Sequence, residues 1–155
     1  MRNSRGQIVV ELAILLPLAF FLIFILAELC FLFNAKQLLY LGSFQAARSY
    51  LVKKDAAAAE TSLQSAISPA VFRETLREAV YLKVSEKGDA VLAEAVLLYR
   101  PLFPVLPLAK LMNIAFFHET HSALVERAVS ERIADGWREK LSSRVPVAAS
   151  VELNR

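Results

Sequence analysis

Cysteine and glycine are scarce in this chain of 155 residues, which contains one Cys and 4 Gly. A single cysteine, Cys30, excludes an intrachain disulfide. Four glycines form neither a Gly-rich phosphate loop nor a Gly-x-Ser-x-Gly nucleophile elbow. The 2 histidines, His118 and His121, lack a third ligand at a recognisable spacing, which favours exposed or interface histidines over a metal site. We therefore predict no catalytic residue, no metal, no cofactor and no enzymatic activity.

A strong excess of one charge is also lacking. The chain has 18 basic and 15 acidic residues, a formal net charge of +3. Bases and acids alternate in the later part of the chain, as they do on a solvated helix surface. This charge balance is too weak to indicate nucleic-acid binding.

A long apolar run between Ile8 and Phe33 dominates the sequence instead. As a helix, Leu12 to Phe33 would measure about 33 Å, enough to cross a hydrocarbon core of ~30 Å. A cleaved secretory signal would have an apolar core of only ~7 to 15 residues. We therefore predict a retained transmembrane helix over residues 7–33, followed by one small domain over residues 34–155.

Charges beside the span predict its orientation. Arg2 and Arg5 precede it without an acid, whereas Lys36 is the only base just after it. Because positive flanks stay in the cytoplasm, we expect a single-pass chain with a cytoplasmic N-terminus and the domain outside the cytoplasm.

Helical spacing continues beyond the span and predicts one helix from about Gln7 to about Val52. Gly42 lies inside this helix, where a glycine often marks close packing. The apolar residues that recur are Leu38, Leu41, Phe44, Arg48 through its aliphatic stem, and Leu51, whereas Gln37, Gln45 and Lys53 are expected to face solvent.

The remaining sequence predicts an α+β fold. Residues 53–67 are rich in alanine and permit a helix, and Ser68 before Pro69 predicts a short helix from Pro69 to about Glu78. Period-two alternation from Val80, a turn at residues 87–89 and a second apolar run predict a β-hairpin. Three prolines within residues 101–107 predict an irregular apolar loop.

The last third of the chain allows two interpretations. In one, residues 114–125 add a third strand and residues 130–141 form a helix, supported by the spacing of Ile133, Trp137 and Leu141. In the other, one uninterrupted helix starts near Phe117. The tail, residues 142–155, is either a strand or a loosely held end. The expected fold is thus a long N-terminal transmembrane helix and a small domain with a short helix and a hairpin or three-stranded antiparallel sheet.

Two acids accompany the apolar span, where a carboxylate near the bilayer centre costs at least ~2.5 kcal/mol. Glu11 and Glu28 would lie about 25 Å apart along a helix, so both can sit near opposite membrane interfaces. We expect Glu28 to be a second intramembrane or interface acid that reaches water by a shift or tilt of the helix.

Glu11 follows a basic leader that ends at Gly6. Cleavage after Gly6 would give Gln7 a positive α-amine, one helical turn from Glu11. In a packed bundle of helices, the carboxylate of one subunit can neutralise the amine of its neighbour. Glu11 would then fix the register of assembly, because a low dielectric penalises an unpaired charge.

The motifs resemble the TadE-like family of pseudopilins, or minor pilins, from the bacterial tight adherence (Flp) pilus system. The matching motifs occur in the family's order. They are Arg5-Gly6, Val10-Glu11-Leu12-Ala13, Leu16-Pro17, Glu28-Leu29 and Ala46-Ala47-Arg48. The segment LLYRPLFPVLP is more weakly similar to the second part of such proteins. The sequence departs from the family pattern at Leu12, usually Phe, and at Gln7, usually a small residue.

The resemblance implies a structural component of the bacterial inner membrane that builds or initiates a pilus, with a periplasmic domain. Implied partners are the membrane, other pilins or pseudopilins through the N-terminal helix, a prepilin peptidase that cleaves between Gly6 and Gln7, and the inner-membrane platform of the pilus. The protein could also enter the surface pilus. The alternative is a signal-anchored periplasmic binding or sensory module, in which the helix is only a tether and Glu11 has no role.

Overall fold

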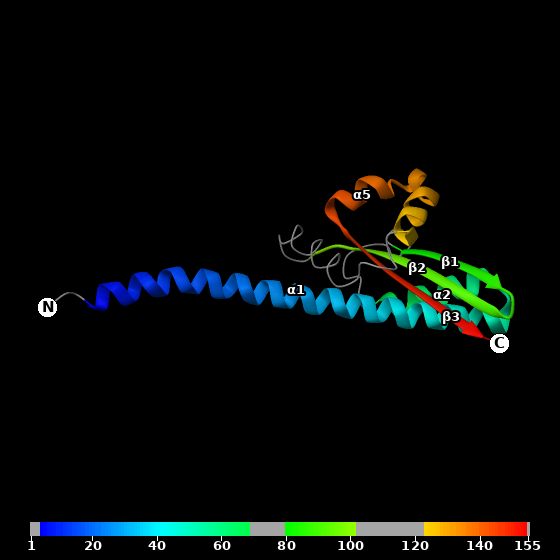
Figure 1. Ribbon diagram of the computed structural model, residues 1–155, viewed down its shortest axis with the longest axis horizontal. Helices are drawn as coiled ribbons and strands as arrows, with labels where there is room; N and C mark the ends of the chain where they lie inside the picture. The colour runs from blue at the N-terminus through cyan, green and yellow to red at the C-terminus, as the bar shows by residue number, and fades with distance from the viewer. Residues whose placement is uncertain (1–3, 69–79, 102–122, 155) are drawn as a thin grey trace.

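The fold consists of one very long helix and a small α+β domain packed on its second half (Figure 1). This computed structural model describes residues 4–68, 80–101 and 123–154. The elements, in order, are α1 (Ser4–Lys53), α2 (Ala56–Ile67), β1 (Val80–Lys87), β2 (Ala90–Tyr99), a helix over residues 123–131, the 3₁₀ turn η2 (Ile133–Asp135), α5 (Trp137–Ser143) and β3 (Val145–Asn154). The predicted α+β class is confirmed, with a three-stranded antiparallel sheet.

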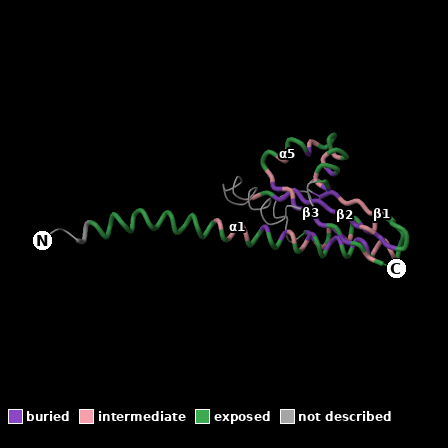
Figure 2. Tube along the Cα trace, in the orientation of Figure 1, coloured by how far each residue is buried: buried purple, intermediate pink, exposed green. Residues whose placement is uncertain are grey.

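Helix α1 confirms the prediction that the apolar helix continues past the span. Its 50 residues correspond to a length of about 75 Å, and Pro17 lies inside it. Residues 8–24 of α1 are exposed, whereas the second half carries α2 and the sheet (Figures 1 and 2). A membrane-type helix tolerates an internal proline when neighbouring groups satisfy the freed backbone carbonyl.

The close packing predicted at Gly42 occurs between α1 and α2. Lys54 reverses the chain with a φ of 54°, and the Asp55 side chain caps α2 by accepting from the Ala57 backbone N–H at 3.0 Å. A Cβ at Gly42 would lie 2.8 Å from Leu63 Cδ1. The helix-permissive stretch at residues 53–67 therefore forms a helix that touches α1 where it has no side chain.

The bulky residues predict the helix correctly but mark the buried face of α1 only in part. Leu38 and Leu51 pack, partly buried, against the core. Leu41 and Phe44 are exposed, whereas mostly small residues form the buried face. Small side chains suit this face because α2 and the sheet approach α1 closely. The buried residues on the second half of α1 are Glu28, Leu32, Ala35, Leu39, Gly42, Ser43, Ala46 and Ala47.

The sheet has the order β1-β2-β3, and both pairs are antiparallel. The predicted hairpin is confirmed, with Lys87 paired to Ala90 and Gly88 at a φ of 64° in the two-residue loop between them. Alternate residues of each strand face α1 and α2, as the period of two predicts. The third strand, however, is the tail, and residues 123–125 of the strand predicted at 114–125 are helical instead.

The other face of the sheet is covered by the helix over residues 123–131, η2 and α5 (Figure 1). Neither an unbroken helix over residues 130–141 nor one from Phe117 is observed, because Gly136 adopts a φ of 71° and ends η2. This break lets Trp137 turn back into the core, where it is fully buried and meets the Tyr81 ring edge-on at a centroid distance of 6.4 Å.

Several sequence expectations lie outside the described residues. These are the short helix from Pro69 to Glu78, the proline-rich loop from residue 102 onward, residues 114–122 of the expected strand, and both histidines, His118 and His121.

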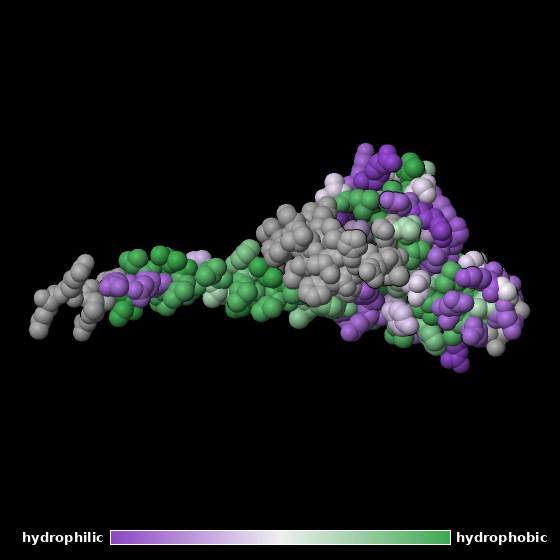
Figure 3. Space-filling view, viewed as in Figure 1, coloured by the Kyte–Doolittle hydropathy of each residue, from purple (hydrophilic) through white to green (hydrophobic). Residues whose placement is uncertain are grey.

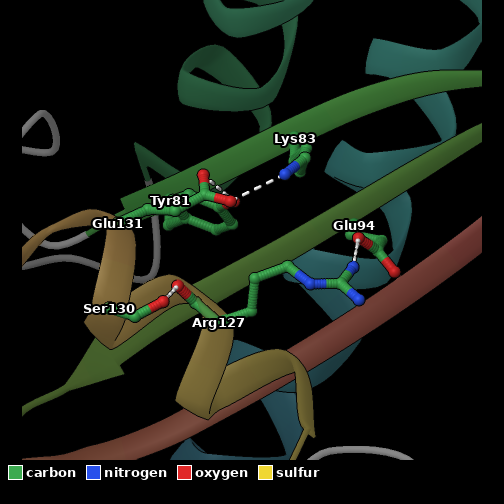
Figure 4. Close-up of polar contacts among 6 residues, drawn as sticks. All are labelled: Tyr81, Lys83, Glu94, Arg127, Ser130 and Glu131. Carbon is green, nitrogen blue, oxygen red and sulfur yellow. Dashed lines mark hydrogen bonds and ion pairs between the residues drawn. The ribbon is translucent and has the colours of Figure 1, made fainter.

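The helix over residues 123–131 is the outer helix of the domain. Ion pairs and a tyrosine hydroxyl link it to the sheet (Figure 4). The Tyr81 hydroxyl and the Lys83 ammonium each donate to Glu131, both at 2.6 Å. Arg127 donates to Glu94 of β2 at 3.0 Å. Two hydrogen bonds hold the pKa of Glu131 below its usual range, and the one from Lys83 has a larger effect than the one from Tyr81.

This contact predicts that Glu131 stabilises the outer helix only while it is ionised. A carboxylate with a depressed folded pKa contributes stability above its unfolded pKa of about 4.3, and that contribution is lost as pH falls through the folded pKa. In detergent, wild type should resist urea better than Glu131→Gln at pH 7, with Trp137, the only tryptophan, as fluorescence reporter. The difference should shrink as pH falls below that reference value and vanish once Glu131 is protonated in the folded state. An equal difference at all pH values would contradict the role.

Candidate functional site: the N-terminal helix and its acids

The first half of α1 exposes apolar side chains all around its circumference. Every large apolar residue from Ile8 to Phe24 is exposed, by 42% to 68%. This half forms the hydrophobic arm in the space-filling view (Figure 3), and green marks its exposure in Figure 2. Exposed apolar area costs roughly 25 cal/mol per Å² in water, so this surface requires an apolar surrounding.

Among the described residues, one helix, from Gln7 to Lys53, is long and apolar enough to cross a membrane. The stretch from Ile8 to Ala27, in which no residue is buried, corresponds to about 30 Å of helix, which equals the thickness of a hydrocarbon core. The helix is compatible with a membrane-anchored protein. Burial under the domain begins at the next residue, Glu28.

Glu11 lies on the exposed arm, one turn after Gln7. The Gln7 side-chain amide donates from Nε2 to Glu11 Oε1 at 3.0 Å. Within the described residues, this is the one side-chain hydrogen bond that Glu11 makes. Gly6, the residue before the expected cut, is in the first turn of α1, where helices fray most readily.

Glu28 is not the hydrated interface acid that the sequence suggested. It is only 3% exposed, and the Tyr99 hydroxyl donates to its Oε1 at 2.9 Å. Tyr99 is the last residue of β2 and faces α1 in the inward alternation of that strand. Burial raises the pKa of Tyr99, and the hydrogen bond to Glu28 adds to this effect.

Glu11 and Glu28 therefore occupy different environments and are not brought together. Their separation of about 25 Å along one helix is too great for shared acid/base chemistry. No group of three potential metal ligands occurs within the described residues. Sequence reasoning missed Tyr99 as a partner of Glu28, although counting the period of two along β2 places it on the inner face.

Comparison with known proteins matches the helix that carries these acids. Residues 6–48 match the family model described as TadE-like protein. The N-terminal helix is therefore similar to that of TadE-like proteins. This match begins at Gly6, includes Glu11 and Glu28, and ends at Arg48, so the resemblance based on the motifs is confirmed.

The TadE-like segment covers 43 of 155 residues (48 − 6 + 1 = 43) and no part of the sheet. It indicates a role in the tight adherence pilus system. No curated protein and no solved structure matches the chain.

Proposed function

We propose that this protein is a pseudopilin or minor pilin that acts in the assembly or initiation of a tight adherence pilus. The observation that carries the proposal is the TadE-like match across Gly6 and Glu11 on a helix with apolar side chains on every side. The helix is inserted in the bacterial inner membrane with its N-terminus in the cytoplasm. The domain is periplasmic.

The membrane span in this proposal is residues 8–27, with the domain beginning at Glu28. This boundary is earlier than the one at Phe33 that hydropathy alone suggests. Glu28 and Leu32 are buried against the domain, so they are withdrawn from lipid. A span of this length needs no tilt to match a core of ~30 Å.

A prepilin peptidase cleaves between Gly6 and Gln7 and leaves the apolar helix in the membrane. The cut lies in the first helical turn, and a peptidase needs a locally extended backbone. Glycine lowers the cost of unwinding this turn, because it is about 1 kcal/mol less favourable than alanine in a helix. Residues 1–6 then serve as a short basic leader.

After cleavage, the exposed helix packs against other pilins or pseudopilins, and Glu11 sets the register. The α-amine of one chain pairs with the Glu11 carboxylate of a neighbour. In a medium of low dielectric, any shift that separates these charges is penalised. The inner-membrane platform of the pilus would receive the assembled helices.

The test is the intact mass of the membrane-extracted protein from cells with an active prepilin peptidase and from cells with a catalytically inactive one. We expect residues 1–6 to be lost only with the active enzyme. A Gly6→Leu variant should remain uncleaved and serves as the control for the site. An unprocessed wild-type chain in both cells would favour a signal-anchored periplasmic module instead.

A further inference from the structure

Cleavage after Gly6 would place a glutamine at the N-terminus, and an N-terminal glutamine can react with itself. Its unprotonated α-amine attacks the side-chain carboxamide carbon Cδ, a five-membered lactam forms, and the bond to the side-chain nitrogen breaks. That nitrogen takes up the amine proton and leaves as ammonia. The product, pyroglutamate, is neutral at the N-terminus, and no co-reactant is consumed.

The geometry at Gln7 opposes this reaction. The carboxamide Nε2 donates to Glu11 Oε1 at 3.0 Å, so the side chain points along α1 toward the next turn. Ring closure requires the same side chain to fold back onto its own backbone nitrogen. The two arrangements of the carboxamide exclude each other, because one amide cannot reach both groups.

The charge of Glu11 acts in the same direction. A carboxylate one turn away favours the protonated form of the α-amine, and a protonated amine has no lone pair for attack. Gln7 and Glu11 both lie on the exposed part of the helix.

We propose that Glu11 has a second role in cis, in which it binds the Gln7 carboxamide and slows the conversion of the new N-terminus to pyroglutamate. Gln7 is thus a modification site, and its modification removes the positive charge that a neighbouring Glu11 requires. A cyclised chain would be processed but unable to form the register pair. This inference rests on the proposed cleavage after Gly6.

The experiment compares processed wild type with Glu11→Ala, Glu11→Asp, Val10→Ala and Gln7→Ala. Each full chain is made in cells with active peptidase, extracted in detergent and incubated. The mass of its N-terminal peptide is then followed over time by mass spectrometry. Loss of one ammonia reports cyclisation. Gln7→Ala cannot cyclise and gives the background, and Val10→Ala controls for truncation of an exposed side chain in the same turn.

We expect Glu11→Ala to cyclise about 1.4- to 2.3-fold faster than wild type, because an i,i+4 side-chain pair on a helix contributes about 0.2–0.5 kcal/mol. Glu11→Asp keeps the charge but is one methylene shorter, so its rate should lie between the two. Val10→Ala should match wild type. A Glu11→Ala chain that is cleaved and cyclises no faster than wild type would overturn the inference.

The same spectra separate this inference from the proposed function. Absence of cleavage in every chain would defeat the proposed function, whereas cleavage with unchanged cyclisation would defeat only the protective role. If Glu11→Ala alone escapes cleavage, the cyclisation rates of Glu11→Asp and wild type decide whether Glu11 protects Gln7. Faster cyclisation of Glu11→Asp supports the role, and an equal rate refutes it.

Discussion

Glu11→Gln is expected to lower pilus number by more than about a hundredfold while leaving cleavage after Gly6 intact. Glutamine preserves the shape of the side chain and removes only its charge. The α-amine of a neighbouring chain then stays unpaired in a medium of low dielectric. Removing one partner of a buried ion pair costs about 3–5 kcal/mol, and 1.4 kcal/mol is a factor of ten in an equilibrium constant.

Pili per cell, counted by electron microscopy in a strain whose only copy carries the variant, measure this effect. Glu11→Asp keeps the charge and should retain part of the function. Val9→Gln places an uncharged amide in the same turn and should assemble normally if charge, rather than polarity, is decisive. Normal piliation by Glu11→Gln would contradict the register role and leave the helix as a simple anchor.

The sequence predicted the elements of this fold better than their contacts. Hydropathy and helical spacing predicted α1 almost to its last residue, and strand alternation placed the β1–β2 hairpin correctly. These patterns are local, because each residue is constrained by neighbours two to four positions away. The motif of Gly6 and Glu11, which lies within the TadE-like match, was likewise recognisable because its residues are close together on one helix.

What could not be predicted depends on residues far apart in the chain. The buried face of α1 is set by α2 and the sheet, so small residues are buried while Leu41 and Phe44 stay exposed. Gly136 interrupts the helical spacing around Trp137. The sequence of the tail allowed a strand or a loose end, and its pairing with β2 decides for the strand. The contact of Glu28 with Tyr99 joins residues 71 positions apart, and no local pattern carries that information.

Tyr99→Phe is expected to lower the melting temperature of the detergent-solubilised protein by about 3–12 °C. The change removes only the hydroxyl that donates to Glu28. A hydrogen bond to a charged group contributes about 1.5–3 kcal/mol, and 1 kcal/mol shifts the melting temperature by about 2–4 °C in a protein of this size. Tyr40→Phe, at an exposed position on α1, the helix that carries Glu28, is the matched control and should melt like wild type.

Glu28→Gln tests the same contact from the other side. The amide keeps the shape and can still accept from Tyr99, so it should destabilise less than Tyr99→Phe. In a double-mutant cycle, Tyr99→Phe should cost less in the Glu28→Gln background, because the remaining bond is between neutral groups. Trp137 fluorescence follows the melting of the domain. Equal losses in both backgrounds would mean that the charge of Glu28 contributes nothing to the bond.

Hydrogen exchange can locate where the Tyr99 hydroxyl acts. Glu28 is the first buried residue after the exposed arm, so its bond to the end of β2 fixes the domain to α1 at the proposed membrane boundary. Tyr99→Phe should therefore speed amide exchange in α1 from about residue 28 to residue 36 and leave residues 8–23 unchanged, since the side chains of that stretch are exposed. Faster exchange along the whole helix would instead indicate general unfolding, and the anchoring role of Glu28 would have to be abandoned.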